Sequence, residues 1–343
     1  MLRTIIGGLV VSTAFLLSVA CSGEGGDPET TPAANGGATI IPIEVATPTA
    51  TAAEPAQPPT ATLSPACPQP GDTGLSSESS SKSVMVDGIQ RTYRLYVPTS
   101  YDATEPVPLV LNFHGLGSNA LEQELYSGFT GLSEREGFIL VSPNGTGFIQ
   151  EWHVLATWLP GYVDDLRFVD TLIDEMVDSL CIDEERIYAA GISNGGAMAS
   201  LAGCNLDRIA AVATVAGAPY SQRRCEAGRP LPIIAFHGTY DGIVPFNLGE
   251  FLGDYLPLTN VREDMQTWSS HNGCDTTAKS EQIATDIVLE AYANCDAGAD
   301  VRLYVIDGGG HTWPGAELNL WYLGRTTQSI DASELIWSFF EER

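Results

Sequence analysis

Short apolar segments that alternate with helix-like segments constrain the fold of this chain more than any other feature. Near residue 84, two such runs flank Asp87-Gly88, a two-residue turn signal that predicts an antiparallel hairpin. The later runs are apolar throughout, as is typical of strands buried on both faces of a parallel sheet. They are Pro108–Phe113, Phe138–Ser142, Arg186–Ile192, Ala210–Val215, Pro232–Phe236 and Val301–Ile306. The sequence therefore predicts a single α/β domain with a mostly parallel central sheet, an N-terminal antiparallel hairpin and helices on both sides.

Two of the intervening segments have the apolar spacing of an amphipathic helix. The first places Leu166, Val169, Ile173, Met176, Val177 and Leu180 on one face. The second closes the chain and does the same with Ala332, Leu335, Ile336, Phe339 and Phe340. Asp331 with Glu334 matches a capping signal at its start.

The chain before this domain divides into two segments. Residues 1–21 combine one basic residue with an apolar stretch that is shorter than the roughly 20 residues of a spanning helix, which indicates an export signal. Leu17–Cys21 resembles the lipobox of bacterial lipoproteins and makes Cys21 a candidate lipidation site; Ser18 stands where that motif prefers leucine, so ordinary signal cleavage is the alternative. Residues 22–66 are rich in Ala, Thr and Pro, and we expect a disordered tether before the folded domain, 67–343.

Charge restricts the possible partners. Residues 67–343 carry 15 basic and 38 acidic side chains, a formal charge of −23. A body this acidic repels nucleic acid and anionic lipid over roughly 8–10 Å. Nucleic-acid binding is therefore not expected, and contact with a membrane is expected only through the N-terminal lipid anchor.

Six cysteines lie in the folded domain: Cys67, Cys181, Cys204, Cys225, Cys274 and Cys295. An even number in an exported chain indicates up to three disulfides, with free buried thiols as the alternative. Cys274 and Cys295 flank an interval whose closure would contribute roughly 3 kcal/mol, and we predict that they pair. The other four cysteines allow three connectivities. Their spacings do not match paired zinc ligands, so no metal site is expected.

The segment Gly191-Ile192-Ser193-Asn194-Gly195 matches the pattern GxSxG. The pattern alone is weak, because one match is expected by chance in roughly a quarter of such chains. Here it follows a predicted strand directly and precedes the helix-compatible stretch Ala197–Ala202, as a nucleophile elbow requires. Ser193 is therefore the candidate nucleophile.

A serine nucleophile in this setting needs an acid and then a histidine later in the chain. His271 and His311 are the histidines that follow Ser193 and a plausible acid. His311 comes directly after the last strand and three glycines, whereas His271 lies far from the end of a strand. Asp241 follows a predicted strand in the position of the acid, and Asp307 is the next candidate.

Negative charge that develops on the substrate would be bound by backbone N–H groups. We predict these donors at Leu116, in the HGLG segment after the strand Pro108–Phe113, and at Asn194. His114 and His237 are interpreted as structural. Trp152 and Trp313 are candidates for the wall of the substrate cleft, and a place in the core is the alternative for each.

Four segments carry a family resemblance: RTYRLYVP (91–98), GISNGGAM (191–198), FHGTYDGIVPF (236–246) and GGGHTWPG (308–315). They are similar to the secreted esterases grouped as polyhydroxybutyrate depolymerase-like and feruloyl esterase-like, which are single-domain α/β-hydrolases that cleave carboxylic esters. The resemblance runs from about residue 84 to the C-terminus. It implies Ser193, Asp241 and His311 as the catalytic triad. Asn194-Gly195-Gly196 looks nearer to the feruloyl and acetyl-xylan branch.

These features lead us to expect an exported serine esterase, lipid-anchored at the cell surface or secreted. The expected substrate is a feruloyl or acetyl ester of plant polysaccharide or a polyhydroxybutyrate-type polyester, and we expect a monomer that needs no cofactor. Only about 16 residues separate Val215 from Pro232, too few for a large helical lid. A serine peptidase and a non-catalytic carbohydrate-binding surface lipoprotein are the alternatives.

Overall fold

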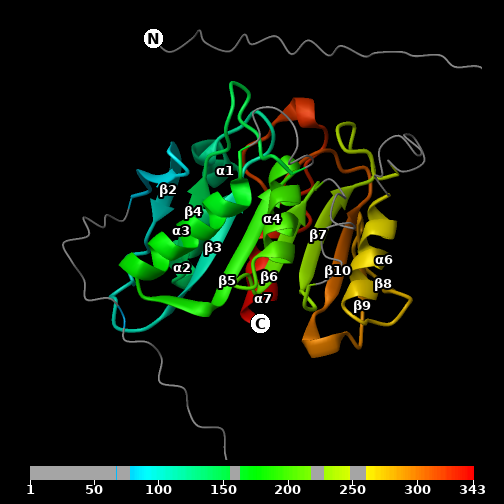
Figure 1. Ribbon diagram of the computed structural model, residues 1–343. Coiled ribbons are helices and arrows are strands. Elements are labelled where there is room, and N and C mark those ends of the chain that lie inside the picture. Colours follow the sequence, from blue (N-terminus) through cyan, green and yellow to red (C-terminus); the bar gives the residue numbers. More distant parts are fainter. Residues whose placement is uncertain (1–66, 68–77, 155–162, 218–227, 248–259) are drawn as a thin grey trace, which may run out of the picture. The chain divides into compact units, whose positions relative to one another are not determined.

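The computed structural model describes Cys67 and residues 78–154, 163–217, 228–247 and 260–343 (Figure 1). The expectations for the export signal, for lipidation of Cys21 and for the tether fall on residues 1–66, outside the described residues. The segment at which we predict no large lid is described only in part, because residues 218–227 are also outside. Within the described residues, no helix is long and apolar enough to cross a membrane.

One sheet organises the described part of the chain, with strand order β1-β2-β4-β3-β5-β6-β7-β10-β9-β8. β1 (Ser80–Val86) and β2 (Ile89–Tyr96) form the predicted antiparallel hairpin. Its turn residues, Asp87 and Gly88, have φ of 50° and 80°, the left-handed conformation that a two-residue hairpin turn requires at both positions. β2 then joins β4 in antiparallel orientation.

The centre of the sheet is parallel, as the apolar runs predict. Its strands are β3 (Val107–Phe113), β4 (Ile139–Pro143), β5 (Ile182–Ile192), β6 (Ala211–Val215), β7 (Ile233–Gly238) and β10 (Val301–Ile306). Because these strands run in one direction, the loops that follow them meet at one edge of the sheet (Figure 1).

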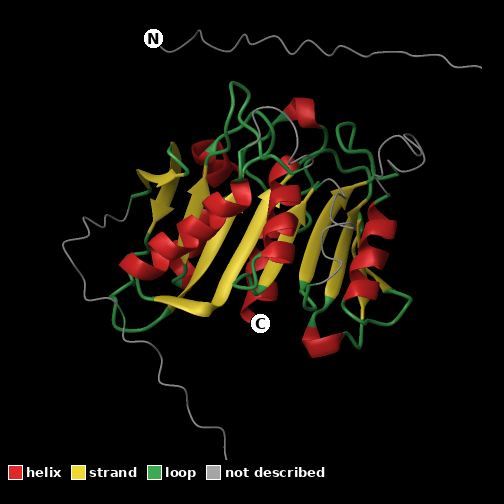
Figure 2. Cartoon of the chain, in the orientation of Figure 1, coloured by secondary structure: helices red, strands yellow, loops and turns green. Residues whose placement is uncertain are grey.

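Helices cover both faces of this sheet (Figure 2). One apolar cluster joins the strands to α3 (Asp165–Ser179), α4 (Asn194–Asn205) and α6 (Val261–His271). The other joins them to α1 (Ala120–Ser127), α2 (Phe129–Glu136) and α7 (Ala332–Glu341). Two short 3₁₀ turns, η3 (Asp296–Gly298) and η4 (Trp321–Leu323), lie in loops. The predicted α/β fold is confirmed.

The start of α7 matches the predicted cap in part. The Asp331 side chain accepts hydrogen bonds from the backbone N–H groups of Ser333 and Glu334. The Glu334 carboxylate instead forms an ion pair with Arg135 of α2. The cap therefore depends on Asp331, while Glu334 ties α7 to its neighbouring helix.

The far edge of the sheet is a hairpin that the apolar patterns did not predict. β8 (Lys279–Ala284) and β9 (Ile287–Tyr292) are antiparallel, and β9 pairs with β10. β8 consists mainly of exposed polar residues, as is common for edge strands, and therefore gives no apolar signal. The interval between Cys274 and Cys295 is thus a hairpin rather than a loop.

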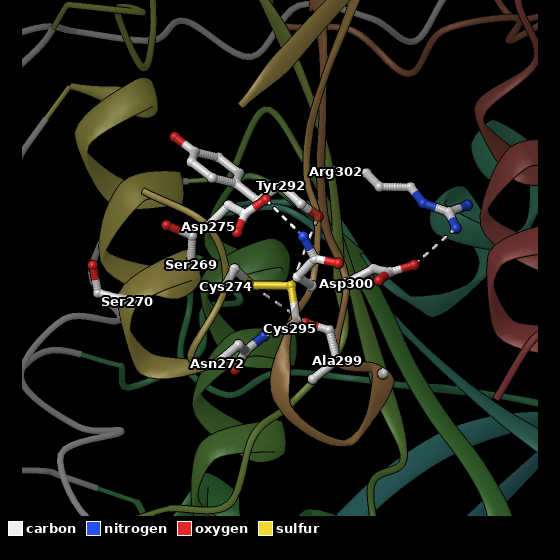
Figure 3. Close-up of a disulfide and its surroundings, with 12 residues drawn as sticks. Ser269, Ser270, Asn272, Cys274, Asp275, Tyr292, Cys295, Ala299, Asp300 and Arg302 are labelled. Atoms are coloured by element: carbon white, nitrogen blue, oxygen red, sulfur yellow. Dashed lines mark hydrogen bonds and ion pairs between the residues drawn. A yellow bond between two sulfur atoms is a disulfide. The ribbon is translucent and has the colours of Figure 1, made fainter. Parts of the chain in front are cut away.

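The structure joins Cys274 to Cys295, as predicted, at the base of this hairpin (Figure 3). The neighbouring Asn272 is buried, and its side-chain amide donates to the carbonyl oxygens of Leu231 and Ala299. A second disulfide joins Cys67 to Cys181. This pairing belongs to one of the three connectivities that the sequence leaves open. Cys204 is also disulfide-bonded, and Cys225 lies outside the described residues.

Replacement of Cys274 and Cys295 by serine should lower the free energy of unfolding by about 3 kcal/mol, because the disulfide restricts the unfolded chain. Urea denaturation of the double variant and the wild type measures this difference. Non-reducing peptide mapping checks the pairing itself. A peptide that links Cys274 to a cysteine other than Cys295 would contradict the structure.

Candidate active site

Ser193 lies on the sharp turn between β5 and α4. Its backbone has φ of 57° and ψ of −122°, a conformation that is strained for any residue other than glycine. The turn is held on both sides, because the N–H of Ser193 donates to Val215 O at 2.9 Å and its carbonyl accepts from Ala197 at 3.1 Å. This is the geometry of a nucleophile elbow.

The two glycines of the GxSxG motif are required by close packing. A Cβ placed on Gly191 would collide with the carbonyl of Gly195, and a Cβ on Gly195 would collide with the carbonyls of Phe113 and His114. These are backbone atoms that cannot rotate away. The motif requires glycine at both positions because β3, β5 and α4 pack against one another so closely at Ser193.

His311 and Asp241 form a buried hydrogen-bonded pair. The distance between His311 Nδ1 and Asp241 Oδ2 is 2.7 Å, and the other carboxylate oxygen accepts from the N–H groups of Ile243 and Val244, each at 2.8 Å. Burial alone would raise the pKa of Asp241, but the hydrogen bonds from His311 and from the Val244 N–H hold this pKa below its ordinary value. Asp241 is therefore ionised, so Nδ1–H of His311 donates to it, and Nε2 is the ring nitrogen that can exchange a proton with Ser193.

Asp307 was the second candidate for the acid of the triad in the sequence. In the structure the Asp307 carboxylate accepts from Thr239 Oγ1 at 3.3 Å, whereas the imidazole of His311 bonds to Asp241. His271, the alternative histidine, is the last residue of α6 and contacts the carbonyl of Arg229. The hydrogen-bonded imidazole and carboxylate are therefore those of His311 and Asp241.

His237 is a second imidazole beside the acid. Its Nε2 lies 2.8 Å from Val244 O and 3.4 Å from Asp241 Oδ2. Burial lowers the pKa of His237 below the ordinary histidine value, so the ring is neutral and Nε2–H donates to the Val244 carbonyl. Its side chain thus helps to fix the loop around Asp241, in keeping with the structural interpretation.

The turn that carries His311 is held by main-chain hydrogen bonds. The N–H of His311 donates to Leu323 O at 2.7 Å, and the N–H of Gly310 donates to Arg325 O at 2.9 Å. On the other side, Tyr240 N–H donates to Gly309 O at 2.9 Å. The loops that contain His311 and Asp241 are therefore connected to each other directly.

The strands β5, β7 and β10 end at the same edge of the sheet (Figure 1), and Ser193, Asp241 and His311 follow these strands in the sequence. The proposed oxyanion loop reaches the same edge, since a Cβ on Gly115 would lie 3.5 Å from Ser193 Cβ. Within the part of the chain that the structure describes, no cluster of His, Cys, Asp and Glu could hold a metal ion.

The predicted oxyanion donors are both available. Among the described residues, no acceptor is bonded to the backbone N–H of Leu116 or of Asn194. His114 is buried and structural, as interpreted, because its Nδ1–H donates to Gly115 O at 2.7 Å. Its Nε2 accepts from Gly145 N–H at 2.9 Å, an arrangement that requires a neutral ring. Burial lowers the pKa of His114 accordingly.

The prediction that Trp152 and Trp313 line the substrate cleft is wrong. Their exposed fractions are 2% and 1%, and each indole N–H has a partner inside the protein. Trp152 donates to His114 O at 2.9 Å, and Trp313 donates to Ser333 Oγ at 3.0 Å. Both rings belong to the core, where indole groups pack well when the N–H is bonded.

A polar cluster supports the histidine turn from outside. Asp286, in the β8–β9 turn, accepts hydrogen bonds from both terminal nitrogens of Arg325 at 2.9 Å and from Thr327 Oγ1 at 2.8 Å. Arg325 in turn donates through Nε to the Gly308 carbonyl at 3.1 Å. Hydrogen bonds from Ser329, Thr327 and Arg325 lower the pKa of Asp286 to about 2.

Comparison with known proteins gives related sequences. Residues 161–285 match the family described as phospholipase/carboxylesterase. The chain is 30% identical over 224 residues to feruloyl esterase B of Piromyces equi, which covers 62% of this chain and 41% of that protein. It is also 30% identical over 255 residues to NocK of Nocardia uniformis subsp. tsuyamanensis, assigned as an esterase, with 68% and 74% covered.

A solved structure shows the same fold. The acetyl xylan esterase from Aspergillus awamori superposes with a TM-score of 0.55 at 16% identity, and the match covers 68% of this chain and 94% of that chain. At this identity the likeness concerns the fold. The chain spans less than half the length of the Piromyces protein, so it corresponds to one part of that relative.

The Asp286 cluster makes the stability of the domain depend on pH. Because the pKa of about 2 lies below the ordinary value of 3.8, the carboxylate stabilises the fold above pH about 4, and this contribution is lost as the pH falls through about 2. Asp286→Asn should therefore lower the free energy of unfolding more at pH 6 than at pH 2.5. Urea denaturation at both pH values measures the difference. Equal losses at the two values would refute it, and Glu317→Gln, at an exposed site, is the control.

Proposed function

This chain belongs to the feruloyl esterase-like family of α/β-hydrolases, and we propose that it is a serine esterase whose nucleophile is Ser193. The observation that carries the assignment of the site is the buried His311–Asp241 pair at the same sheet edge as the strained Ser193. The serine peptidase and the non-catalytic binding protein are not favoured, since the relatives are named as esterases.

The reaction follows from this arrangement. Ser193 Oγ attacks the ester carbonyl while His311 Nε2 takes its proton, and the imidazolium then protonates the departing alkoxide. Asp241 holds Nδ1–H and stabilises the imidazolium. Water then attacks the acyl-enzyme by the same route, which releases the acid and restores Ser193. No step requires a cofactor.

Two backbone N–H groups would bind the tetrahedral oxyanion. Leu116 supplies one from the loop after β3, and Asn194 supplies the other from the first position of α4. Such donors act in the transition state, and removal of one typically costs about 10²–10³ in kcat.

For the substrate, we propose a feruloyl or acetyl ester of plant polysaccharide, with a polyhydroxybutyrate-type polyester as the alternative. Support comes from the relative named as feruloyl esterase B. The acidic domain also disfavours substrates with many free carboxylates.

The disulfides suggest an extracellular protein, because such bonds persist in oxidising compartments. We further propose that it is a monomer, held at the cell surface through Cys21 or released by signal cleavage.

Ser193→Ala should lower kcat by about 10⁴-fold or more and leave the fold intact, because the nucleophile is lost. Turnover of p-nitrophenyl acetate and circular dichroism measure these two properties. Diisopropyl fluorophosphate should label Ser193 in the wild type; labelling of a different serine would disprove the assignment.

Asp241→Asn should be similarly severe, because an amide favours the wrong tautomer of His311. The matched control is Asp307→Asn, which removes a carboxylate of the neighbouring loop and should retain most of the activity. More than about a tenth of wild-type activity in Asp241→Asn would place the acid elsewhere.

The kinetics should be those of an esterase with an open site. Because the segment after β6 is too short for a large lid, we expect smooth saturation with short acyl esters and a fall in rate beyond about eight carbons. Rates across a series of p-nitrophenyl esters measure this preference. A sharp rise in activity above the solubility limit of the substrate would indicate a lipase instead.

A further inference from the structure

A small hairpin follows β4 and is hydrogen-bonded to both segments that carry the proposed oxyanion donors. Thr146 and Glu151 pair through reciprocal backbone hydrogen bonds of 3.1 and 2.9 Å. Residues 145–152 are called the brace hairpin below. The tip residue Phe148 is fully exposed, while Trp152 at the base is buried.

The base of the brace hairpin is bonded to the residue after the nucleophile. Trp152 N–H donates to Asn194 Oδ1 at 2.7 Å, and Asn194 Nδ2 donates to Trp152 O at 3.1 Å. The side-chain amide thus pairs with one backbone residue in both directions. A carboxylate could make one of these bonds and an aliphatic side chain neither, so the pairing is specific for asparagine.

The same hairpin is bonded to the oxyanion loop. Gly117 N–H donates to Gln150 O at 2.8 Å, and Gly145 N–H donates to His114 Nε2 at 2.9 Å. The indole of Trp152 donates to His114 O at 2.9 Å. These three bonds hold the chain at His114 and at Gly117, on either side of Leu116, which carries the proposed donor.

The two donors lie beyond the ends of different strands: Leu116 in the loop after β3, and Asn194 at the first position of α4, which follows β5. β3 and β5 are paired up to Phe113 and Gly191, beyond which the chain turns away on both sides. We propose that the brace hairpin sets the separation between the N–H groups of Leu116 and Asn194. Asn194, through its side chain, and Trp152 are then positioning residues of the oxyanion hole. This inference rests on the proposed function.

The expected effect follows from the geometry that an oxyanion requires. Donors act when they lie about 2.7–3.1 Å from the developing charge, and a misplacement of about 1 Å can cost on the order of 10²-fold. Asn194→Ala keeps both backbone donors but removes both bonds to Trp152. This variant should therefore stabilise the transition state less, while its affinity for the substrate should change little.

The experiment compares p-nitrophenyl acetate with its thionoester analogue. Sulfur is larger than oxygen and a weak acceptor, so the thionoester gains little from donors placed for an oxyanion. Asn194→Ala should lower kcat for the oxygen ester by about 10–100-fold with KM changed less than about threefold. The rate for the thionoester should fall less, so the ratio of the oxygen-ester rate to the thionoester rate should decrease. The matched control is Asn205→Ala at the exposed C-terminal end of α4, which should leave the ratio unchanged.

Trp152→Phe provides a second route to the same answer, because it removes the bond to His114 O while it keeps an aromatic ring. Its rate ratio should fall in the same direction. Near-UV circular dichroism and Tm establish that each variant is folded; if Asn194→Ala is not, Trp152→Phe decides.

An unchanged ratio of the two rates in the folded variants would contradict the proposal that the brace hairpin positions the two donors. Failure of the proposed function looks different, because wild-type protein would then show no ester turnover or no fluorophosphonate label on Ser193.

Discussion

The contact between β3, β5 and α4 at Ser193 is the constraint on which the rest of the site depends. Gly191 and Gly195 allow backbone atoms of these elements to touch, and a methyl group at either position would force them apart. The strained backbone of Ser193 is kept by this packing and by its bond to Val215. Because β5 is central and buried, the strain is opposed by the core of the whole sheet.

A buried carboxylate is the second demanding feature, since removal of a charge from water is costly unless it is bonded. Asp241 meets this cost locally. One oxygen accepts two backbone N–H groups, and the other accepts from His311 beside the neutral ring of His237. The same hydrogen bonds that keep the Asp241 carboxylate ionised also fix its orientation toward His311. The contacts that stabilise this loop are therefore also those that catalysis needs.

The sequence predicted those parts of the fold that depend on local or strongly apolar patterns. The buried strands, the Asp87-Gly88 turn and the elbow are of this kind, and the pairing of Cys274 with Cys295 followed from their spacing. The β8–β9 hairpin has polar, exposed residues and left no such pattern. Long-range partners were also beyond reach: nothing local in the sequence connects Cys67 with Cys181.

The same distinction applies to the site. Ser193, Asp241 and His311 could be placed because each follows a strand in a fixed chain order. Asn194 was predicted to act through its backbone, whereas the partner of its side chain, Trp152, lies 42 residues away. Trp152 itself was placed in the cleft because residue type alone does not distinguish an exposed indole from one bonded to His114 O.

Three exposed side chains on the loops of the site are not part of its support. Leu116, Tyr240 and Trp321 are 59%, 80% and 82% exposed, yet the loops that carry them are fixed through main-chain bonds. Tyr240 bonds to the glycine turn through its N–H, and η4 meets His311 through the carbonyl of Leu323. Main-chain bonds of this kind do not depend on side-chain identity. The exposed positions can therefore vary with the ester that is bound, while Ser193, Asp241 and His311 keep their geometry.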